Sequence, residues 1–207
     1  MLNGERKLRV AVLVSGGGTN LQAVLDAAKD GVIQNAEVAL VLSNNPAAYA
    51  LQRAQRAGVP TVVLSRRDLG GQEQFEMEMI RVLEDCGIDL IVLAGFMTIL
   101  SENFTRRYDH RILNVHPSLI PAFCGKGYYG LRVHEEALAR GVKLSGATVH
   151  FVNEIPDGGE IIAQKAVEVL PGDTPELLQR RVMEQAEWIL LPQAIETVAR
   201  QWLKITP

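Results

Sequence analysis

The sequence predicts an α/β protein with a mostly parallel mixed sheet flanked by helices and with antiparallel strands added in its C-terminal half. In the first half, short β-branched apolar runs alternate with longer segments whose apolar residues recur at helical spacing, as in βαβ units. In the second half, two long strand-like runs, 145–152 and 160–169, are joined by the turn-rich stretch 153–159. A hairpin-like pair added to parallel strands gives a mixed sheet.

Each element follows from a local pattern. Apolar, β-branched runs predict the parallel strands 8–15, 36–43, 60–65, 90–94 and 111–116, of which the wholly apolar 90–94 is expected to be central. Helical spacing predicts helices over 20–29, 47–57, 72–86, 102–108 and 131–140. Gly31, Gly58 and Gly87 follow the first three of these, as glycine often does at helix ends. The last helix, 176–202, is expected to bend near Pro192, because proline removes a backbone donor.

The bulk properties favour one domain over residues 1–207, since no linker or repeat interrupts the chain. A net charge of −3 without a Lys/Arg run argues against a nucleic-acid partner. The apolar runs are too short to cross a bilayer, and the first lacks the cleavage site of a signal peptide. Cys86 and Cys124 form neither a disulfide framework nor a CxxC pair. We therefore expect a cytoplasmic protein without a nucleic-acid or membrane partner.

The stretch SGGGTNLQ, residues 15–22, lies where the first strand turns into the first helix. Glycines let the backbone approach a ligand closely, and N–H groups at a helix N-terminus favour an anion such as phosphate. Thr19 and Asn20 are good N-cap residues, so a tight turn with an ordinary cap is the alternative. A GxGxxG fingerprint would need glycine where Leu21 stands, and no Walker motif is present. A monophosphate or sugar phosphate fits better than NAD or ATP.

Asn114 and His116 stand at i and i+2 near the C-terminal end of a strand, so their side chains face the same way. An amide donates hydrogen bonds without titrating, and histidine exchanges a proton near neutral pH. Together they suit an oxyanion that forms at an acyl carbon, although a structural histidine is the alternative. Glu154 and Asp157 could supply a carboxylate for the histidine, but spacing alone brings neither to it. Asp157, before two glycines, is also typical of a turn.

No metal site is predicted, because the four histidines lack ligand-like spacing and neither cysteine pairs with one of them. There is no GxSxG motif, and Cys124 is interpreted as an incidental loop residue. Without a nucleophile, direct transfer through a tetrahedral intermediate is the more economical mechanism.

Several separated motifs, in this order, resemble the folate-dependent glycinamide ribonucleotide formyltransferases of purine synthesis. They are VLVSGGGTNLQ, LAGFMTILS, ILNVHPSLIPAF, SGATVHFVNEIPDGGEII and AEWILLPQAI, and the similarity runs from Leu8 to about Ile195. The resemblance implies a Rossmann-like fold with a phosphate-binding half, 1–100, and a catalytic and folate-binding half, 101–207. It also implies transfer of a formyl group from 10-formyltetrahydrofolate to the amine of glycinamide ribonucleotide, without a metal, in a monomer or homodimer.

The resemblance also assigns site residues. Asn114, His116 and Asp157 fall on the family's catalytic triad, in which Asp157 would raise the pKa of a protonated His116 and orient a water. The residues implied for the ribonucleotide are Gly17, Gly18, Thr19, Asn20, Pro117 and Glu187. The residues implied for the folate are Gln72, Phe96, Met97, Thr98, Ile99, Leu100, Asn114, Val152, Asn153, Glu154 and Asp157. Plain core packing is the alternative for Ile99 and Leu100, and a solvated helix charge is the alternative for Glu187.

Four departures from the family pattern stand out. Thr98 occupies a position where the family often has arginine, and Gln72 aligns with a basic residue that can approach the folate tail. The loop 122–130 is longer than the family's short form, and Arg132 replaces a histidine after it.

The alternative functions use the same site or the same fold. A formyltetrahydrofolate hydrolase would replace the amine with water, but that family usually carries an N-terminal regulatory domain. Methionyl-tRNA formyltransferase needs a further tRNA-binding domain. A binder of sugar phosphate or folate without catalysis would be expected to lose the triad.

Overall fold

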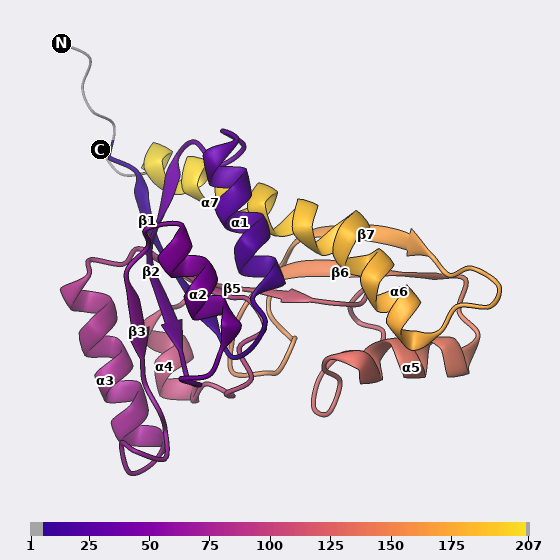
Figure 1. Ribbon diagram of the computed structural model, residues 1–207, viewed down its shortest axis with the longest axis horizontal. Coiled ribbons are helices and arrows are strands. Elements are labelled where there is room, and N and C mark those ends of the chain that lie inside the picture. The colour runs from indigo at the N-terminus through magenta and orange to yellow at the C-terminus, as the bar shows by residue number, and fades with distance from the viewer. Residues whose placement is uncertain (1–5, 206–207) are drawn as a thin grey trace. The chain divides into compact units, whose positions relative to one another are not determined.

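The computed structural model describes residues 6–205, and the chain forms two compact units (Figure 1). The first unit contains the residues up to Ile99 together with those from Ile195 onward, and the second is Leu100–Ala194. The predicted single domain over 1–207 stays a prediction, and its ends, 1–5 and 206–207, lie outside the described residues.

The first unit is built on parallel strands, as the alternating apolar and helical patterns predict. Its strands are β1 (Leu8–Val14), β2 (Ala36–Ser43), β3 (Thr61–Val63) and β4 (Leu90–Leu93). Pairing of β1 with both β2 and β4, and of β2 with β3, gives the order β3-β2-β1-β4. The wholly apolar β4 is buried along its length, as its sequence predicts. The connecting helices are α1 (Thr19–Lys29), α2 (Tyr49–Arg56) and α3 (Gln72–Asp85).

One detail of the first unit differs from the sequence prediction. Neither Thr19 nor Asn20 caps α1; the N-cap is Gly18, and no side chain caps the helix there. Gly18 has a φ of 73°, in the left-handed region, and an added Cβ would lie 2.6 Å from the Cβ of Ala50 in α2. Glycine is therefore required at this position, where the chain passes close to α2.

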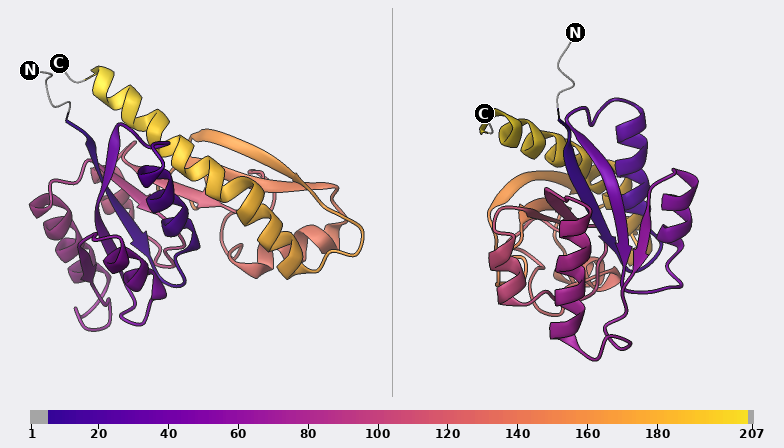
Figure 2. Two further views of the ribbon diagram at one scale, coloured as in Figure 1. Left: turned by 45° about the horizontal axis from the view of Figure 1, so that its top comes forward. Right: turned by 90° about the vertical axis from the view of Figure 1, so that its left-hand side faces the viewer.

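The second unit is built on antiparallel strands, β5 (Ile112–His116), β6 (Leu144–Phe151) and β7 (Ile161–Glu168), with β6 paired to both others. Figure 2 shows β6 and β7 side by side along their length. Helix α4 (Glu102–Arg107) precedes β5, and α5 (Leu131–Arg140) packs against α6 (Pro175–Val182) (Figure 1).

The C-terminal helical region is interrupted by a π-helical segment that the sequence pattern does not predict. A five-residue π-helical segment, η1 (Met183–Glu187), separates α6 from α7 (Trp188–Ile205), and Pro192 lies inside α7. The bend expected near Pro192 stays a prediction; the hydrogen-bond pattern changes before that residue, at Met183–Glu187, where residues shift from i−4 to i−5 acceptors. π-Helical turns recur at functional sites, and this one ends at Glu187.

The element order confirms the predicted α/β class, in which parallel strands come first and antiparallel strands are added in the C-terminal half. Within residues 6–205 no helix is long and apolar enough to cross a membrane.

Candidate active site

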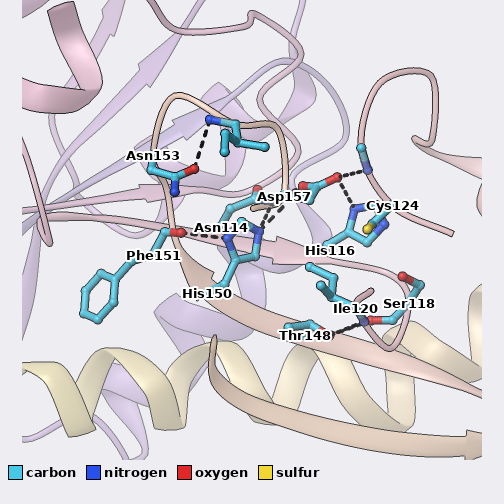
Figure 3. A network of polar contacts seen from close by, with 12 residues as sticks. Asn114, His116, Ser118, Ile120, Cys124, Thr148, His150, Phe151, Asn153 and Asp157 are labelled. Carbon is cyan, nitrogen blue, oxygen red and sulfur yellow. Dashed lines mark hydrogen bonds and ion pairs between the residues drawn. The ribbon is translucent and has the colours of Figure 1, made fainter. Parts of the chain in front are cut away.

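Asn114 and His116 point to the same side of β5, as their spacing predicts (Figure 3). The antiparallel register places Asn114 opposite His150 and His116 opposite Thr148, both on β6. Because cross-strand partners share a face of the sheet, β6 adds a second histidine to the site. His150 was not among the site residues predicted from the sequence, although its period-two position beside Thr148 was a usable signal.

Asp157 reaches both histidines from the loop after β6. Its Oδ2 lies 3.5 Å from His116 Nδ1, and its Oδ1 lies 3.6 Å from His150 Nε2. The amide of Asn114 is 3.5 Å from the same Oδ1, so one carboxylate faces all three side chains (Figure 3). The fold thus brings together the three residues that the resemblance assigns to the triad. Glu154, the other carboxylate considered, is exposed and is not among these contacts.

Two glycines fix the position of Asp157, whose own φ is 56°. A Cβ on Gly159 would lie 1.8 Å from the Phe151 carbonyl oxygen, and one on Gly158 would lie 2.6 Å from Ile155 Cγ2. Any larger residue at position 159 must push the loop away from β6. The sequence DGG is therefore more than a turn signal, because it sets how deeply the carboxylate enters the site.

His116 is buried, and each of its ring nitrogens faces an acceptor. Its Nε2 lies 2.8 Å from the Phe123 carbonyl oxygen, and its Nδ1 faces Asp157. A neutral imidazole has one N–H, whereas the imidazolium has two and could donate to both acceptors. Burial lowers the pKa of His116 below its ordinary value, although the Asp157 carboxylate and the Phe123 carbonyl act in the opposite direction. The expected rise due to Asp157 is present, but burial outweighs it.

Asp157 keeps its negative charge despite being largely buried. Burial raises the pKa of Asp157, but hydrogen bonding to His150, the His116 ring and the Gly125 N–H together lower it below its ordinary value. The Gly125 N–H donates to Oδ2 at 2.8 Å. Gly125 and Phe123 both belong to the lengthened loop 122–130, so this loop contacts both members of the His116–Asp157 pair.

His150 holds Asn114 in place. Its Nδ1 lies 2.8 Å from the Phe151 carbonyl oxygen, and its Nε2 lies 3.2 Å from the Asn114 amide nitrogen. One amide hydrogen of Asn114 is directed at this Nε2, which also faces Asp157 Oδ1 at 3.6 Å. The other amide hydrogen makes only the long contact to Asp157 and can turn toward a ligand oxygen.

The chain directly after His116 is held by Thr148. Its hydroxyl donates to the Ser118 carbonyl at 2.7 Å and accepts from the Ile120 N–H at 3.1 Å (Figure 3). Ser118 in turn donates to the Ala122 carbonyl at 2.6 Å. These bonds fix the exit from β5, which includes Pro117.

A further histidine, His134 of α5, is fully buried beside this site. Neither ring nitrogen has a hydrogen-bond partner among the described residues. Burial, and then the nearby His116 ring, lower the pKa of His134 to about 4. It is therefore uncharged at neutral pH and adds no second positive charge next to His116.

The glycine loop of the first unit has carbonyl groups that are tied back to helices. Gly16 accepts from the Ala50 N–H at 3.0 Å, Gly17 accepts from Arg53 Nε at 2.8 Å, and Gly18 accepts from the Gln22 N–H. No group in residues 6–205 accepts from the N–H groups of these three glycines. An added Cβ on Gly16 or Gly17 would meet nothing within 4 Å, so the loop is open to a ligand. Backbone N–H groups without an acceptor in the described residues, next to the positive charge of Arg53, are suited to binding an anion. Arg53 was not among the site residues predicted from the sequence.

The segment after β4 presents apolar side chains to solvent. Met97 is 57% exposed and Ile99 is 74% exposed, which rules out core packing for Ile99. Phe96, Thr98 and Leu100 are half-buried. Thr98, where the family often has arginine, accepts a hydrogen bond from Asn44, and Gln72 donates to the Ile99 carbonyl. Exposed methionine and isoleucine side chains beside polar backbone suit a flat, partly apolar ligand.

The remaining predicted site residues lie in the second unit. Val152 and Asn153 are half-buried at the start of the loop that carries Asp157, and the Val152 N–H donates to the Ile112 carbonyl. Glu187 is 6% exposed at the end of the π-helical turn, so it is not a solvated helix charge. No cluster of three or more potential metal ligands occurs in the part of the chain that the structure describes.

This arrangement of an amide, an imidazole and a carboxylate on an α/β scaffold is suited to stabilising an oxyanion at an acyl carbon. The chain belongs to the formyl transferase family, whose model matches residues 8–195.

Its relatives narrow the family further. A phosphoribosylglycinamide formyltransferase of Haemophilus influenzae is 42% identical over 91% of this chain and 85% of its own length. The crystal structure of glycinamide ribonucleotide transformylase 1 from Symbiobacterium toebii matches with a TM-score of 0.88 and 42% identity, over 96% of this chain and 90% of that one. These matches confirm the predicted Rossmann-like formyltransferase fold.

A trifunctional purine biosynthetic protein of Drosophila melanogaster is 44% identical over 98% of this chain. The chain spans 15% of that relative's length. A formyltetrahydrofolate deformylase from Pseudomonas syringae pv. tomato is more distant, with 28% identity, a TM-score of 0.84 and 62% of its chain covered.

Proposed function

We propose that this protein transfers the formyl group of 10-formyltetrahydrofolate to the amine of glycinamide ribonucleotide. The products are the N-formyl ribonucleotide and tetrahydrofolate, a step of de novo purine (IMP) biosynthesis. Family membership and the names of the similar formyltransferases support the reaction class. The observation that carries the proposal is the position of His116 between two acceptors, beside an amide that can reorient.

The reaction needs no covalent bond to the protein. The amine nitrogen attacks the formyl carbon, and the formyl oxygen becomes an oxyanion. The Asn114 amide and the His116 ring donate hydrogen bonds to this oxygen. His116 Nε2 gives up its contact with the Phe123 carbonyl and donates to the oxyanion instead. Collapse breaks the bond between the formyl carbon and N10 of the folate. The proton lost by the amine reaches N10, and a water held by Asp157 relays it.

Asp157 acts mainly through charge. The free His116 ring is kept neutral by burial, but an imidazolium between the oxyanion and Asp157 would face two negative groups and donate to both. The site is therefore arranged for the charge of the tetrahedral intermediate rather than for that of the free enzyme.

The ribonucleotide phosphate binds the N–H groups of the glycine loop, Gly17–Asn20, with Arg53 supporting the loop from behind. Pro117 and Glu187 contact the ribosyl–glycinamide part. A buried carboxylate suits this part of the substrate, because it accepts hydrogen bonds from ribose hydroxyls and from an amine.

The folate pterin binds the segment 96–100 and the loop 152–157. Met97 and Ile99 supply apolar contact, and backbone groups of both segments bind the pterin edges. Gln72 supports the folate-binding segment rather than contacting the folate strongly, because its amide already donates to Glu76 and to the Ile99 carbonyl. With two unpaired cysteines and small-molecule substrates, we assign the reaction to the cytoplasm.

The test is to incubate the purified protein with 10-formyltetrahydrofolate, with and without glycinamide ribonucleotide, and to follow release of tetrahydrofolate. Release that depends on the ribonucleotide, together with formylated product, is expected. Release without the ribonucleotide would mean hydrolase activity, and no release in either mixture would leave a binding protein. His116→Ala should abolish ribonucleotide-dependent release while the protein stays folded.

A further inference from the structure

The segment Phe96–Ile99 is held by polar side chains from three different elements of the first unit. The Ser15 hydroxyl, after β1, accepts from the Met97 N–H at 2.9 Å. The Asn44 amide, after β2, donates to the Thr98 hydroxyl at 2.7 Å, and Gln72 of α3 donates to the Ile99 carbonyl at 3.0 Å. Consecutive residues of the segment are thus each fixed by one side chain.

These hydrogen bonds are important because side-chain packing contributes little to holding the segment in place. The side chains of Met97 and Ile99 are mostly exposed, so few buried contacts oppose local movement. The position of the Met97 backbone consequently depends on the hydroxyl that binds its N–H.

Ser15 differs from the other two anchors in its place along the chain. It is the residue directly before the glycine loop, and its carbonyl accepts from the Asn45 amide at 3.1 Å. The next two carbonyls, of Gly16 and Gly17, are tied to α2. An anion bound to the loop N–H groups would fix the backbone torsions that also set the direction of the Ser15 hydroxyl. Ser15 is therefore joined on one side to the loop and on the other to Met97.

We propose that Ser15 is a positioning residue that couples the two substrate sites. A phosphate ester on the glycine loop and a folate on the Phe96–Ile99 segment both favour the arrangement in which the Ser15–Met97 bond is made. Each ligand then tightens binding of the other by the same factor, as linkage requires. The inference rests on the proposed function, since that assigns the two ligands.

The test measures the dissociation constant of tetrahydrofolate by calorimetry, without and with saturating glycinamide ribonucleotide. This pair cannot react, because no formyl group is present. For the unmodified protein we expect affinity to rise about 5-fold or more when the ribonucleotide is bound. In Ser15→Ala the ratio should fall to near one. Ser15→Cys, of almost the same size but with a weak acceptor, should behave like Ser15→Ala, and Ser15→Thr, which keeps the hydroxyl, should retain coupling.

Thr174→Ala is the matched control. Thr174 accepts from the Leu177 N–H at 3.3 Å at the start of α6, so this variant also loses one hydroxyl acceptor for a backbone donor. Its coupling ratio should equal that of the unmodified protein.

The outcomes separate the two proposals. Binding of both ligands with no coupling in the unmodified protein would overturn the role of Ser15 and leave the proposed function standing. An unchanged ratio of tetrahydrofolate affinities with and without the ribonucleotide in Ser15→Ala and Ser15→Cys would also overturn the role of Ser15 and leave the proposed function standing. Failure of the unmodified protein to bind either ligand would overturn the proposed function, and this inference with it.

Discussion

Asp157→Asn removes the negative charge beside His116 while keeping the size of the side chain. Between unit charges 3.5 Å apart, an effective dielectric constant near 20 gives about 5 kcal/mol. Screening reduces this value, because the Asp157 side chain is 14% exposed. If about half remains, the transition state loses about 2–3 kcal/mol, which lowers turnover roughly 30- to 200-fold.

The same change should move the pH profile. Asp157 raises the pKa of His116, so its removal lowers that pKa, and activity that needs the protonated ring should decline at a lower pH than in the unmodified protein. Turnover is measured by tetrahydrofolate release across pH, and folding is checked by circular dichroism. Asp85→Asn, which removes an exposed carboxylate at the end of α3, serves as the control and should change neither quantity. A folded Asp157→Asn protein with turnover within about 3-fold of normal and an unshifted profile would refute the electrostatic role.

Three further predictions follow from the backbone and from one ion pair. Gly18→Ala should weaken ribonucleotide binding by about 1–2 kcal/mol, or roughly 5- to 30-fold, because its Cβ would clash with α2. Gly31→Ala, with a similar φ of 76° and nothing within 4 Å of an added Cβ, should leave that affinity unchanged in calorimetry. Gly159→Ala should lower turnover far more than Gly31→Ala in the same assay; equal effects would mean that the loop can relax. Asp173→Asn should cost about 2 kcal/mol of unfolding free energy at pH 7 in urea titrations, since the carboxylate pairs with Arg181 at 2.5 and 2.6 Å. Hydrogen bonding to Arg181 lowers the pKa of Asp173, so this stabilising contribution is present above the unfolded-state pKa of about 4 and is lost as pH falls through the folded-state pKa. The difference in unfolding free energy between the unmodified protein and Asp173→Asn should therefore shrink in that acidic range. A difference that stays constant with pH would contradict this role of Asp173.

The order of elements could be read from the sequence because local patterns determine it. Alternating apolar runs and helical spacing gave every strand and helix of both units to within a few residues. The interruption of the C-terminal helix could not be found in this way. Proline is a visible signal at position 192, whereas the π-helical turn at Met183–Glu187 has no residue type that marks it. Likewise, the clash that makes Gly18 the N-cap of α1 depends on α2, which local sequence does not describe.

The residues of the candidate site also fall into those that local sequence predicts and those that only the fold brings together. The i, i+2 spacing of Asn114 and His116 was sufficient to place both on one side of a strand. Asp157 needed either the fold or the family resemblance, since only strand pairing brings its loop to β5. His150 was rejected because metal-ligand spacing was the pattern sought, and its part in holding Asn114 arises from cross-strand register. The net pKa direction of His116 depends on burial, which spacing does not reveal.

The close approach of Gly159 to the Phe151 carbonyl makes the loop between them a spacer of fixed length. The exposed Glu154 lies inside this spacer and away from both glycine contacts, so its side chain can be exchanged without moving the carboxylate that follows. An insertion or deletion of one residue there would instead change the number of residues between Phe151 and Gly159, and would displace Asp157. A change of loop length is therefore expected to cost more activity than a change of the exposed side chain at Glu154.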